Sequence, residues 1–178
     1  PDLVQSVLTT IDASGLPRGC VRLELSERAG VPDLTRALGS LHEIAAAGVR
    51  IALDDLGASL DTLRVLDRLP IETIKLDRSL VVGAGAREPV DTEVLSLVVR
   101  LSQRFGLEIV GEGVELPLDE MTLRCAGVAL AQGFRYSHPL PADEVVPIML
   151  STTATPRSMP GGAPEVPRPH EEAVPLPK

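Results

Sequence analysis

Aromatic side chains are almost absent from this chain, which has no Trp, one Tyr and two Phe among its 178 residues. A core must therefore be built from aliphatic side chains, and a hydrophobic content of 44% supplies enough of them for one domain. Cysteine is also scarce, because Cys20 and Cys125 stand alone without a CxxC spacing. This excludes a disulfide scaffold and a structural zinc module, and it favours a reducing, cytoplasmic location.

Basic side chains and long apolar runs are lacking as well. The chain has 17 Lys and Arg against 25 Asp and Glu, a formal net charge of −8, and no basic cluster of the kind that polymeric DNA or RNA requires. No apolar run approaches the ~20 residues of a membrane helix, so we expect no membrane segment here. The chain starts at Pro1 rather than Met, which leads us to expect a longer polypeptide upstream.

Composition divides the chain into two parts. Residues 151–178 hold seven of the sixteen prolines and almost no periodic apolar residues, which predicts a disordered Pro-rich C-terminal tail. Residues 1–150 alternate short β-branched runs with longer segments of helical period, which is typical of an α/β domain with parallel strands. The stretch 81–88 has the glycine spacing of a dinucleotide loop only in part, and we expect a surface loop there.

The alternation predicts five strands and six helices. The strands are expected at 21–25, 49–55, 71–77, 107–113 and 128–134, and the helices at 2–13, 33–47, 58–68, 91–104, 117–125 and 142–150. Right-handed crossovers would make the strands parallel. Five strands cannot close an eight-stranded barrel, which typically needs ~250 residues. The sheet is therefore either open or the later part of a barrel that begins upstream.

Polar side chains stand at the carboxyl end of every expected strand. Strand alternation turns Glu24 and Lys75 away from the covering helices. Asp54, Glu112 and Gln132 come near the ends of their own strands. In barrels and in open α/β sheets this edge carries the active site. Because several buried charges at one rim need partners, a purely structural role does not explain them.

Four of these strand-end residues are carboxylates, namely Glu24, Asp54, Asp55 and Glu112. Hard oxygen ligands in this number suit Mg²⁺, Mn²⁺ or Ca²⁺, and two ions would activate water and stabilise the leaving oxygen at a phosphorus centre. Lys75 would stabilise charge on the phosphate or orient that water. The residues thus favour metal-assisted hydrolysis of a phosphodiester, with another metal-dependent barrel hydrolase left open.

Five segments resemble the C-terminal two thirds of an EAL domain, the bacterial cyclic di-GMP phosphodiesterase family. They are LELSE at 23–27, DDLGASLDTL at 54–63, LPIETIKLDRSLV at 69–81, VGEGVE at 110–115 and QGFRYSHPLP at 132–141. They follow the family order with comparable spacing. The resemblance implies a (β/α) TIM-type barrel of which this chain holds about five parallel strands with covering helices. The first three strands of the family barrel are absent.

The resemblance also implies a role for each matching residue. Metal ligands would be Glu24, Asp54, Asp55 and Glu112, and the catalytic set would be Lys75, Glu112, Gln132 and Glu115. Gln132 would support the water network, and Glu115 would steady the loop after the double aspartate. The cofactors would be Mg²⁺ or Mn²⁺, two ions in the complete site, and the reaction would convert cyclic di-GMP to linear pGpG.

Departures from the family pattern keep a second interpretation open. The Glu-Ala-Leu strand and the Asn-bearing strand that supply two further ligands have no counterpart here, and the family's Thr-Gly after the double aspartate is Ala58-Ser59. A degenerate EAL module that binds cyclic di-GMP or a protein partner without catalysis would fit these changes. A homodimer and an upstream sensor or diguanylate-cyclase-like domain are compatible with the resemblance.

Overall fold

A computed structural model describes residues 3–57 and 61–151 of the chain. They fall into two units, of which the first ends at Pro139 and contains all five strands, and the second begins at Leu140. Each unit is described by itself. The expected tail at 151–178 lies outside the described residues except for Ser151, so its disorder and the domain boundary at residue 150 stay predictions.

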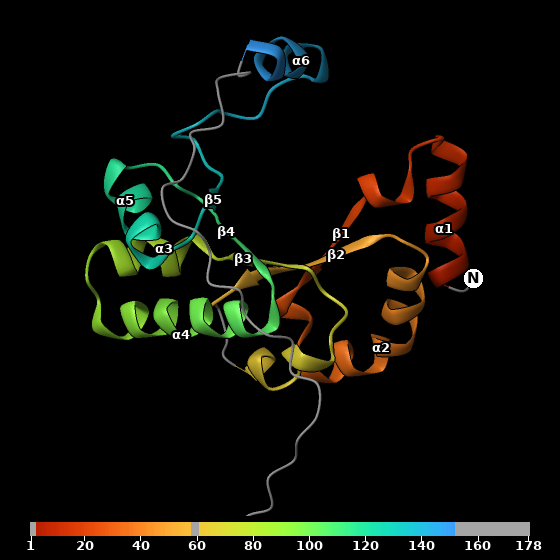
Figure 1. Cartoon of the computed structure of the whole chain (residues 1–178), viewed down its shortest axis with the longest axis horizontal. Coiled ribbons are helices and arrows are strands. Elements are labelled where there is room, and N and C mark those ends of the chain that lie inside the picture. The colour runs from red at the N-terminus through yellow and green to blue at the C-terminus, as the bar shows by residue number, and fades with distance from the viewer. Residues whose placement is uncertain (1–2, 58–60, 152–178) are drawn as a thin grey trace, which may run out of the picture. The chain divides into compact units, whose positions relative to one another are not determined.

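The first unit is built on one parallel sheet in which the strands follow the order of the sequence (Figure 1). The strands are β1 (Arg22–Ser26), β2 (Arg50–Leu56), β3 (Thr73–Leu76), β4 (Glu108–Gly111) and β5 (Leu130–Ala131). Every neighbouring pair is parallel. The α/β class and the five parallel strands expected from the sequence are confirmed. A sheet whose strand order equals its sequence order is the arrangement found in a (β/α) barrel.

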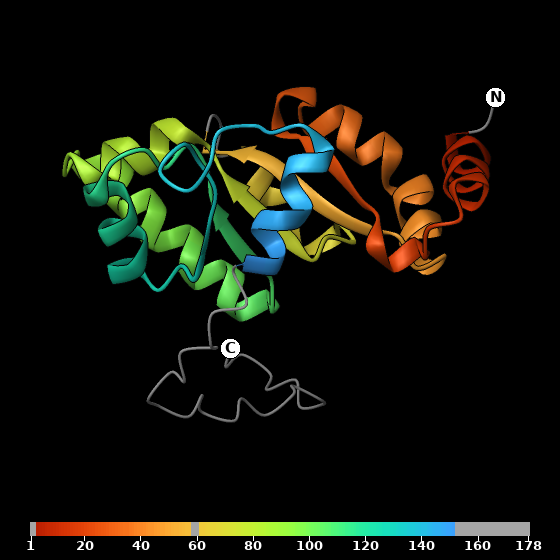
Figure 2. The same ribbon diagram turned by 90° about the horizontal axis from the view of Figure 1, so that it is seen from above.

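Helices lie on one side of the sheet (Figure 2). They are α1 (Leu3–Ser14), α2 (Val31–Ala46), α3 (Arg78–Gly85), α4 (Pro89–Phe105) and α5 (Pro117–Ala126). Helix α1 precedes the first strand and packs on α2, and the others link successive strands except β2 and β3, which are joined by short 3-10 turns. The side chains of Ile74 and Leu76, which alternate with Thr73 and Lys75 along β3, are fully buried in the core. At Gly111 the covering helix comes so close that an added Cβ would lie 2.3 Å from Leu123 Cδ1.

Two expected elements were wrong. In place of a helix at 58–68, the described part has the short 3-10 turns η3 (Asp61–Arg64) and η4 (Leu66–Arg68), and residues 58–60 lie outside the described residues. Pro70 explains the stop, because the residue before a proline avoids helical backbone and Leu69 is extended at φ −80°, ψ 132°.

The surface loop expected at 81–88 is also wrong, because α3 runs through it to Gly85. Asp77 starts this helix, since its carboxylate accepts a hydrogen bond from the backbone N–H of Ser79 at 2.7 Å. Leu80, Val81 and Ala84 are buried at helical spacing. The glycines that suggested a loop are therefore helix residues in close contact with neighbouring helices.

The other face of the sheet carries polar side chains, and it is curved. Arg22 on β1 and Glu108 on β4 form an ion pair at 3.6 Å, and Thr73 on β3 donates to the same Glu108 carboxylate at 3.4 Å. Strands spaced ~4.8 Å apart would place β1 and β4 ~14 Å apart in a flat sheet. The contact across two intervening strands fits a sheet that bends toward this face, as part of a barrel wall does.

The second unit contributes α6 (Ala142–Ser151), close to the helix expected at 142–150. Asp143 and Glu144 lie in its first turn, where acidic side chains favour the positive end of the helix dipole. Among the described residues, none of the helices combines the length and the apolar character needed to cross a membrane.

Candidate metal centre

A distortion in β2 brings two consecutive aspartates into one site. Along a regular strand Asp54 and Asp55 would face opposite sides of the sheet. The pairing of β2 with β3 is irregular between Leu53 and Leu56, and Asp55 adopts a left-handed backbone with φ 60°. This kind of bulge adds a residue and re-aims side chains. One oxygen each of Asp54, Asp55 and Glu112 consequently lie within 4.8 Å of one another.

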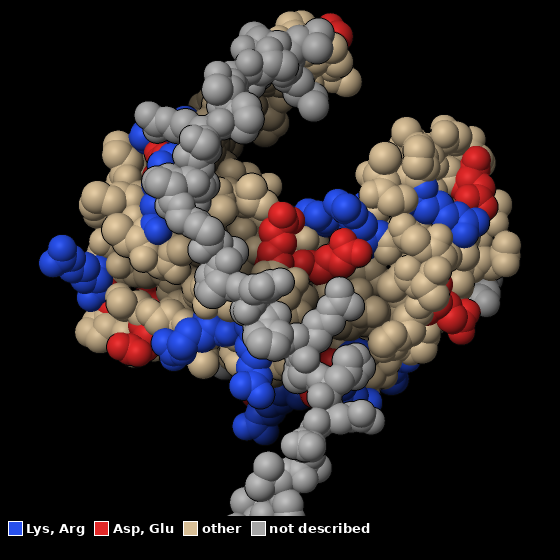
Figure 3. Space-filling model, viewed as in Figure 1, with Lys and Arg blue, Asp and Glu red and all other residues tan. Residues whose placement is uncertain are grey.

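Lys75 lies among the acidic side chains of three strands. Its Nζ is 2.7 Å from Glu112 Oε1, 2.8 Å from Asp54 Oδ1 and 3.0 Å from Glu24 Oε2. The Lys75 side chain is 10% exposed, against 46% for Glu24, so the centre is covered on one side and open at Glu24. Acidic side chains gather over the strands in the middle of this face (Figure 3). The expected convergence of strand-end residues is thus present.

Burial and neighbouring charges shift the pKa values of Lys75 and Glu112, and their balance differs between the two residues. Burial alone would lower the pKa of Lys75, but its hydrogen bonds to Asp54, Glu112 and Glu24 outweigh that effect and hold the pKa above its usual value. Burial raises the pKa of Glu112; Lys75 opposes this, while the nearby charges of Asp54 and Asp55 reinforce it. The lysine is therefore a cation at neutral pH, and the cluster carries an excess of negative charge.

Gln132 and Glu115 take different places at the rim. Gln132 donates from Nε2 to Glu112 Oε1 at 2.5 Å, so it belongs to the cluster. Its backbone is held beside Val114, because Gly133 approaches so closely that an added Cβ would lie 2.3 Å from the Val114 carbonyl oxygen. Glu115 forms an ion pair with Arg78 at 2.5 Å. Its role in steadying the loop after the double aspartate stays a prediction, since that loop includes residues outside the described part.

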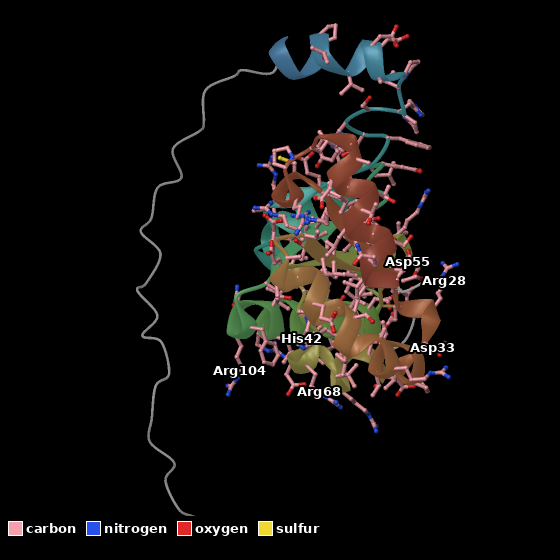
Figure 4. All side chains as sticks on the ribbon, turned by 90° about the vertical axis from the view of Figure 1, so that its right-hand side faces the viewer. Arg28, Asp33, His42, Asp55, Arg68 and Arg104 are labelled. Atoms are coloured by element: carbon pink, nitrogen blue, oxygen red, sulfur yellow. The ribbon has the colours of Figure 1, made fainter. Side chains whose placement is uncertain are left out.

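Two residues in the turn after β1, neither of which the sequence predicted as part of the site, contact the double aspartate and the loop after it. Glu27 is buried, with 3% exposure, and accepts a hydrogen bond from the Gly57 backbone N–H at 3.2 Å. Arg28 pairs with Asp55, Nε to Oδ2, at 3.4 Å, and the two side chains lie next to each other in Figure 4. The sequence signal for this contact is Glu27 itself, an acidic residue just beyond the end of the strand that carries Glu24.

The arrangement fits a divalent cation. Ions such as Mg²⁺ and Mn²⁺ bind carboxylate oxygens at roughly 2.0–2.3 Å, so ligand oxygens around one ion lie up to about 4.6 Å apart. The oxygens of Asp54, Asp55 and Glu112 span no more than 4.8 Å. These three residues would hold the ion, and Glu24 stands on the open side of the same cluster. Fold and site together define part of an α/β barrel wall with an acidic rim whose carboxylates could hold a metal ion.

The chain belongs to the EAL domain family, whose pattern it matches over residues 1–139. Over 139 residues it is 32% identical to the cyclic di-GMP phosphodiesterase NbdA of Pseudomonas aeruginosa, covering 78% of this chain and 18% of that protein. It is also 32% identical to the bifunctional diguanylate cyclase/cyclic di-GMP phosphodiesterase MucR of the same organism, covering 81% and 21%. The chain thus spans about a fifth of these relatives.

Solved structures share the fold. The phosphodiesterase of MucR in complex with c-di-GMP superposes with a TM-score of 0.74 at 32% identity, covering 80% of this chain and 57% of that chain. The EAL domain of DcpA from Mycobacterium smegmatis gives 0.77 at 36%, covering 85% and 67%. BlrP1 from Klebsiella pneumoniae, solved with manganese and cyclic di-GMP, gives 0.69 at 30%, covering 78% and 35%.

Proposed function

We propose that this chain carries the rim of metal ligands and catalytic side chains of a phosphodiesterase that hydrolyses cyclic di-GMP to linear pGpG. The observation that supports this most directly is the convergence of Glu24, Asp54 and Glu112 on Lys75 at the carboxyl ends of parallel strands. A divalent ion bound there, Mg²⁺ or Mn²⁺, would supply a Lewis acid for water and for the phosphate oxygens. Cyclic di-GMP is the preferred substrate in this proposal, because one relative is named as its phosphodiesterase and a similar solved structure contains it.

The chain's own residues have separable tasks in this proposal. Asp54, Asp55 and Glu112 would bind the first ion, and Glu24 would contribute one ligand toward a second ion. Lys75, a buried cation, would stabilise negative charge on the phosphate. Gln132 fixes the orientation of Glu112 through its hydrogen bond. Glu115 would act from the rim, held by Arg78.

The test is hydrolysis of cyclic di-GMP by the full-length protein with Mg²⁺ or Mn²⁺, followed by separation of the nucleotides. We expect pGpG as the product and a loss of at least 100-fold in rate for Asp54→Asn and for Glu112→Gln, because each removes a charged metal ligand while keeping its shape. Glu43→Gln, an exposed change on α2, is the matched control. Unchanged turnover in the two site variants would remove the proposed centre from the reaction.

A second candidate is an EAL module that binds cyclic di-GMP or a protein partner without cleaving anything. The ion pair between Arg28 and Asp55 favours it, because the guanidinium pairs with one oxygen of a carboxylate that the metal site would need. Calorimetry separates the two candidates. Tight, metal-independent binding of cyclic di-GMP without release of pGpG supports the binding module, whereas metal-dependent turnover supports the enzyme.

We further propose that the protein works in the bacterial cytoplasm. Cys20 and Cys125 are both free thiols, which suits a reducing compartment. A homodimer and an upstream sensor or diguanylate-cyclase-like domain are also proposals, the latter by analogy with the bifunctional MucR. Size-exclusion chromatography with light scattering on the full-length protein tests the dimer.

A further inference from the structure

The ammonium of Lys75 shares carboxylate partners with the candidate metal site. Its three carboxylate partners lie on β1, on β2 and directly after β4, all within 3.0 Å of Nζ. Two of these residues, Asp54 and Glu112, also belong to the group whose oxygens converge within 4.8 Å. The same side chains therefore serve as partners of the lysine and as prospective ligands of an ion.

The Lys75 ammonium and a divalent ion cannot both bind these carboxylate oxygens at the same time and in the same arrangement. An ammonium has three N–H donors, and here three carboxylate oxygens lie within 3.0 Å of it. A divalent ion draws carboxylate oxygens to about 2.0–2.3 Å and repels a neighbouring positive charge. Four carboxylates with no cation among them would repel one another strongly. The lysine therefore stabilises the cluster when no metal is bound, and the ion stabilises it when one is.

We propose that Lys75 is the built-in counter-ion of the metal-free site. It keeps Glu24, Asp54 and Glu112 together until a divalent ion arrives, and it then releases at least one of these carboxylates to the ion. In this step Lys75 is a positioning residue that sets how tightly the ion binds. The inference rests on the proposed function for the identity of the ion, but it concerns binding alone and is tested without the nucleotide.

The sequence offers an internal control for this test, because Lys75 and Lys178 are the only lysines in the chain. Lysine labelled with ¹³C and ¹⁵N gives side-chain signals from these two residues in the full chain. On titration with Mg²⁺, which is diamagnetic, we expect the Lys75 Cε and Nζ signals to shift with saturation while those of Lys178 stay in place. Magnesium binding by calorimetry without movement of the Lys75 signals would overturn the proposal, and so would the absence of binding.

Substitution gives a second, independent measurement. In Lys75→Met we expect Mn²⁺ to bind about tenfold more tightly or better than in the unaltered chain, because a competing positive charge has been removed. With chelator present the same variant should melt at a lower temperature, and Mn²⁺ should raise its Tm by more than it raises the Tm of the unaltered chain. A lysine that only shapes the site would give weaker binding in Lys75→Met, and that result would overturn the proposal.

Two control variants isolate the charge at this position. Lys75→Arg keeps the charge and should bind Mn²⁺ within a few-fold of the unaltered chain. Arg50→Met removes a cation whose partner is Glu72, 3.5 Å away, and should leave the affinity unchanged. If cyclic di-GMP is not hydrolysed while these metal responses appear, the proposed function fails and the role of Lys75 stands. If Lys75→Met does not fold, the proposal is decided by the magnesium titration of the Lys75 NMR signals in the unaltered chain.

Discussion

The buried carboxylate of Glu27 accepts a hydrogen bond from the backbone N–H of Gly57 at 3.2 Å. This contact ties the turn after β1 to the first residue of the loop that follows the double aspartate and Leu56. Glu27 is 3% exposed and Gly57 is half-buried, so water cannot readily replace the bond. The position of Asp55 depends on the same short loop, which makes Glu27 a support for the metal centre.

For Glu27→Ala we expect unfolding in urea to become easier by about 1–3 kcal/mol, because the Gly57 N–H loses its acceptor in a partly buried place. We also expect weaker Mn²⁺ binding, since Asp55 would be less firmly held. Glu43→Ala, on the exposed side of α2, should stay within about 0.5 kcal/mol of the unaltered chain. Equal stability of the two variants would show that Glu27 does not support the loop.

The left-handed backbone at Asp55 predicts a difference between two substitutions that remove the same carboxylate. Asp55→Ala places a Cβ at φ 60°, whereas Asp55→Gly does not. We expect the glycine variant to be more stable by about 1–2 kcal/mol in chemical denaturation, with Mn²⁺ binding weakened equally in both. If alanine proved as stable as glycine, the strand would be free to relax and the bulge would not be fixed.

The close approach of Gly111 to Leu123 gives a prediction on packing. Gly111→Ala should destabilise the domain by about 1–3 kcal/mol, because an added Cβ would meet Leu123 Cδ1 at 2.3 Å and Leu123 is 2% exposed. Combined with Leu123→Ala, the loss should be clearly smaller than the sum of the two single losses, since the clash disappears. Additive losses in urea unfolding would contradict the close contact.

Acid should weaken the contact between α5 and the segment after β5. The hydrogen bond from Arg135 Nε to Glu120 Oε2, at 2.5 Å, lowers the pKa of Glu120, and Arg124 acts in the same direction. A lowered folded-state pKa stabilises the folded chain above the unfolded value of about 4.3. That contribution is lost as pH falls through the folded pKa.

Carboxyl NMR titration checks this prediction. The Glu120 pKa should rise in Arg135→Gln and rise less in Arg124→Gln, because the bond to Arg135 is the larger cause. In Arg135→Gln the pH dependence of the urea midpoint should also become flatter below about pH 4.3. A Glu120 pKa that does not respond to Arg135→Gln would rule out this pair as the source of the acid sensitivity.

The hydrophobic periodicity of the sequence was sufficient to predict the sheet, and the polar residues at the strand ends were sufficient to predict the cluster. Parallel strands bring their carboxyl ends to one edge, so Glu24, Lys75 and Glu112 could be placed together from their positions alone. The same logic did not reach α3, because two glycines suggested a loop and their packing against other helices is a tertiary property. The segment expected to be helical up to residue 68 forms 3-10 turns that end at Arg68, and residue type alone does not separate such turns from an α-helix.

The sequence did not predict the backbone conformation and side-chain contacts within the site. Simple alternation puts Asp54 and Asp55 on opposite faces, and only the irregular pairing with β3 shows how both serve one site. The contacts of Glu27 and Arg28 likewise depend on how a turn folds back over a neighbouring loop. Such turns are set by backbone conformations that residue type alone leaves open.

The bulge at Asp54 and Asp55 has an evolutionary consequence. Two adjacent residues place their carboxylates at one candidate metal site, between the buried side chains of Leu53 and Leu56. Under the proposed function, a change of either acid to its amide would remove a charged ligand of the ion and keep the shape of the side chain. If the proposed function holds, a descendant with one such change would lose cleavage and keep recognition, so a sensor of the nucleotide would lie a short mutational step from an enzyme that destroys it.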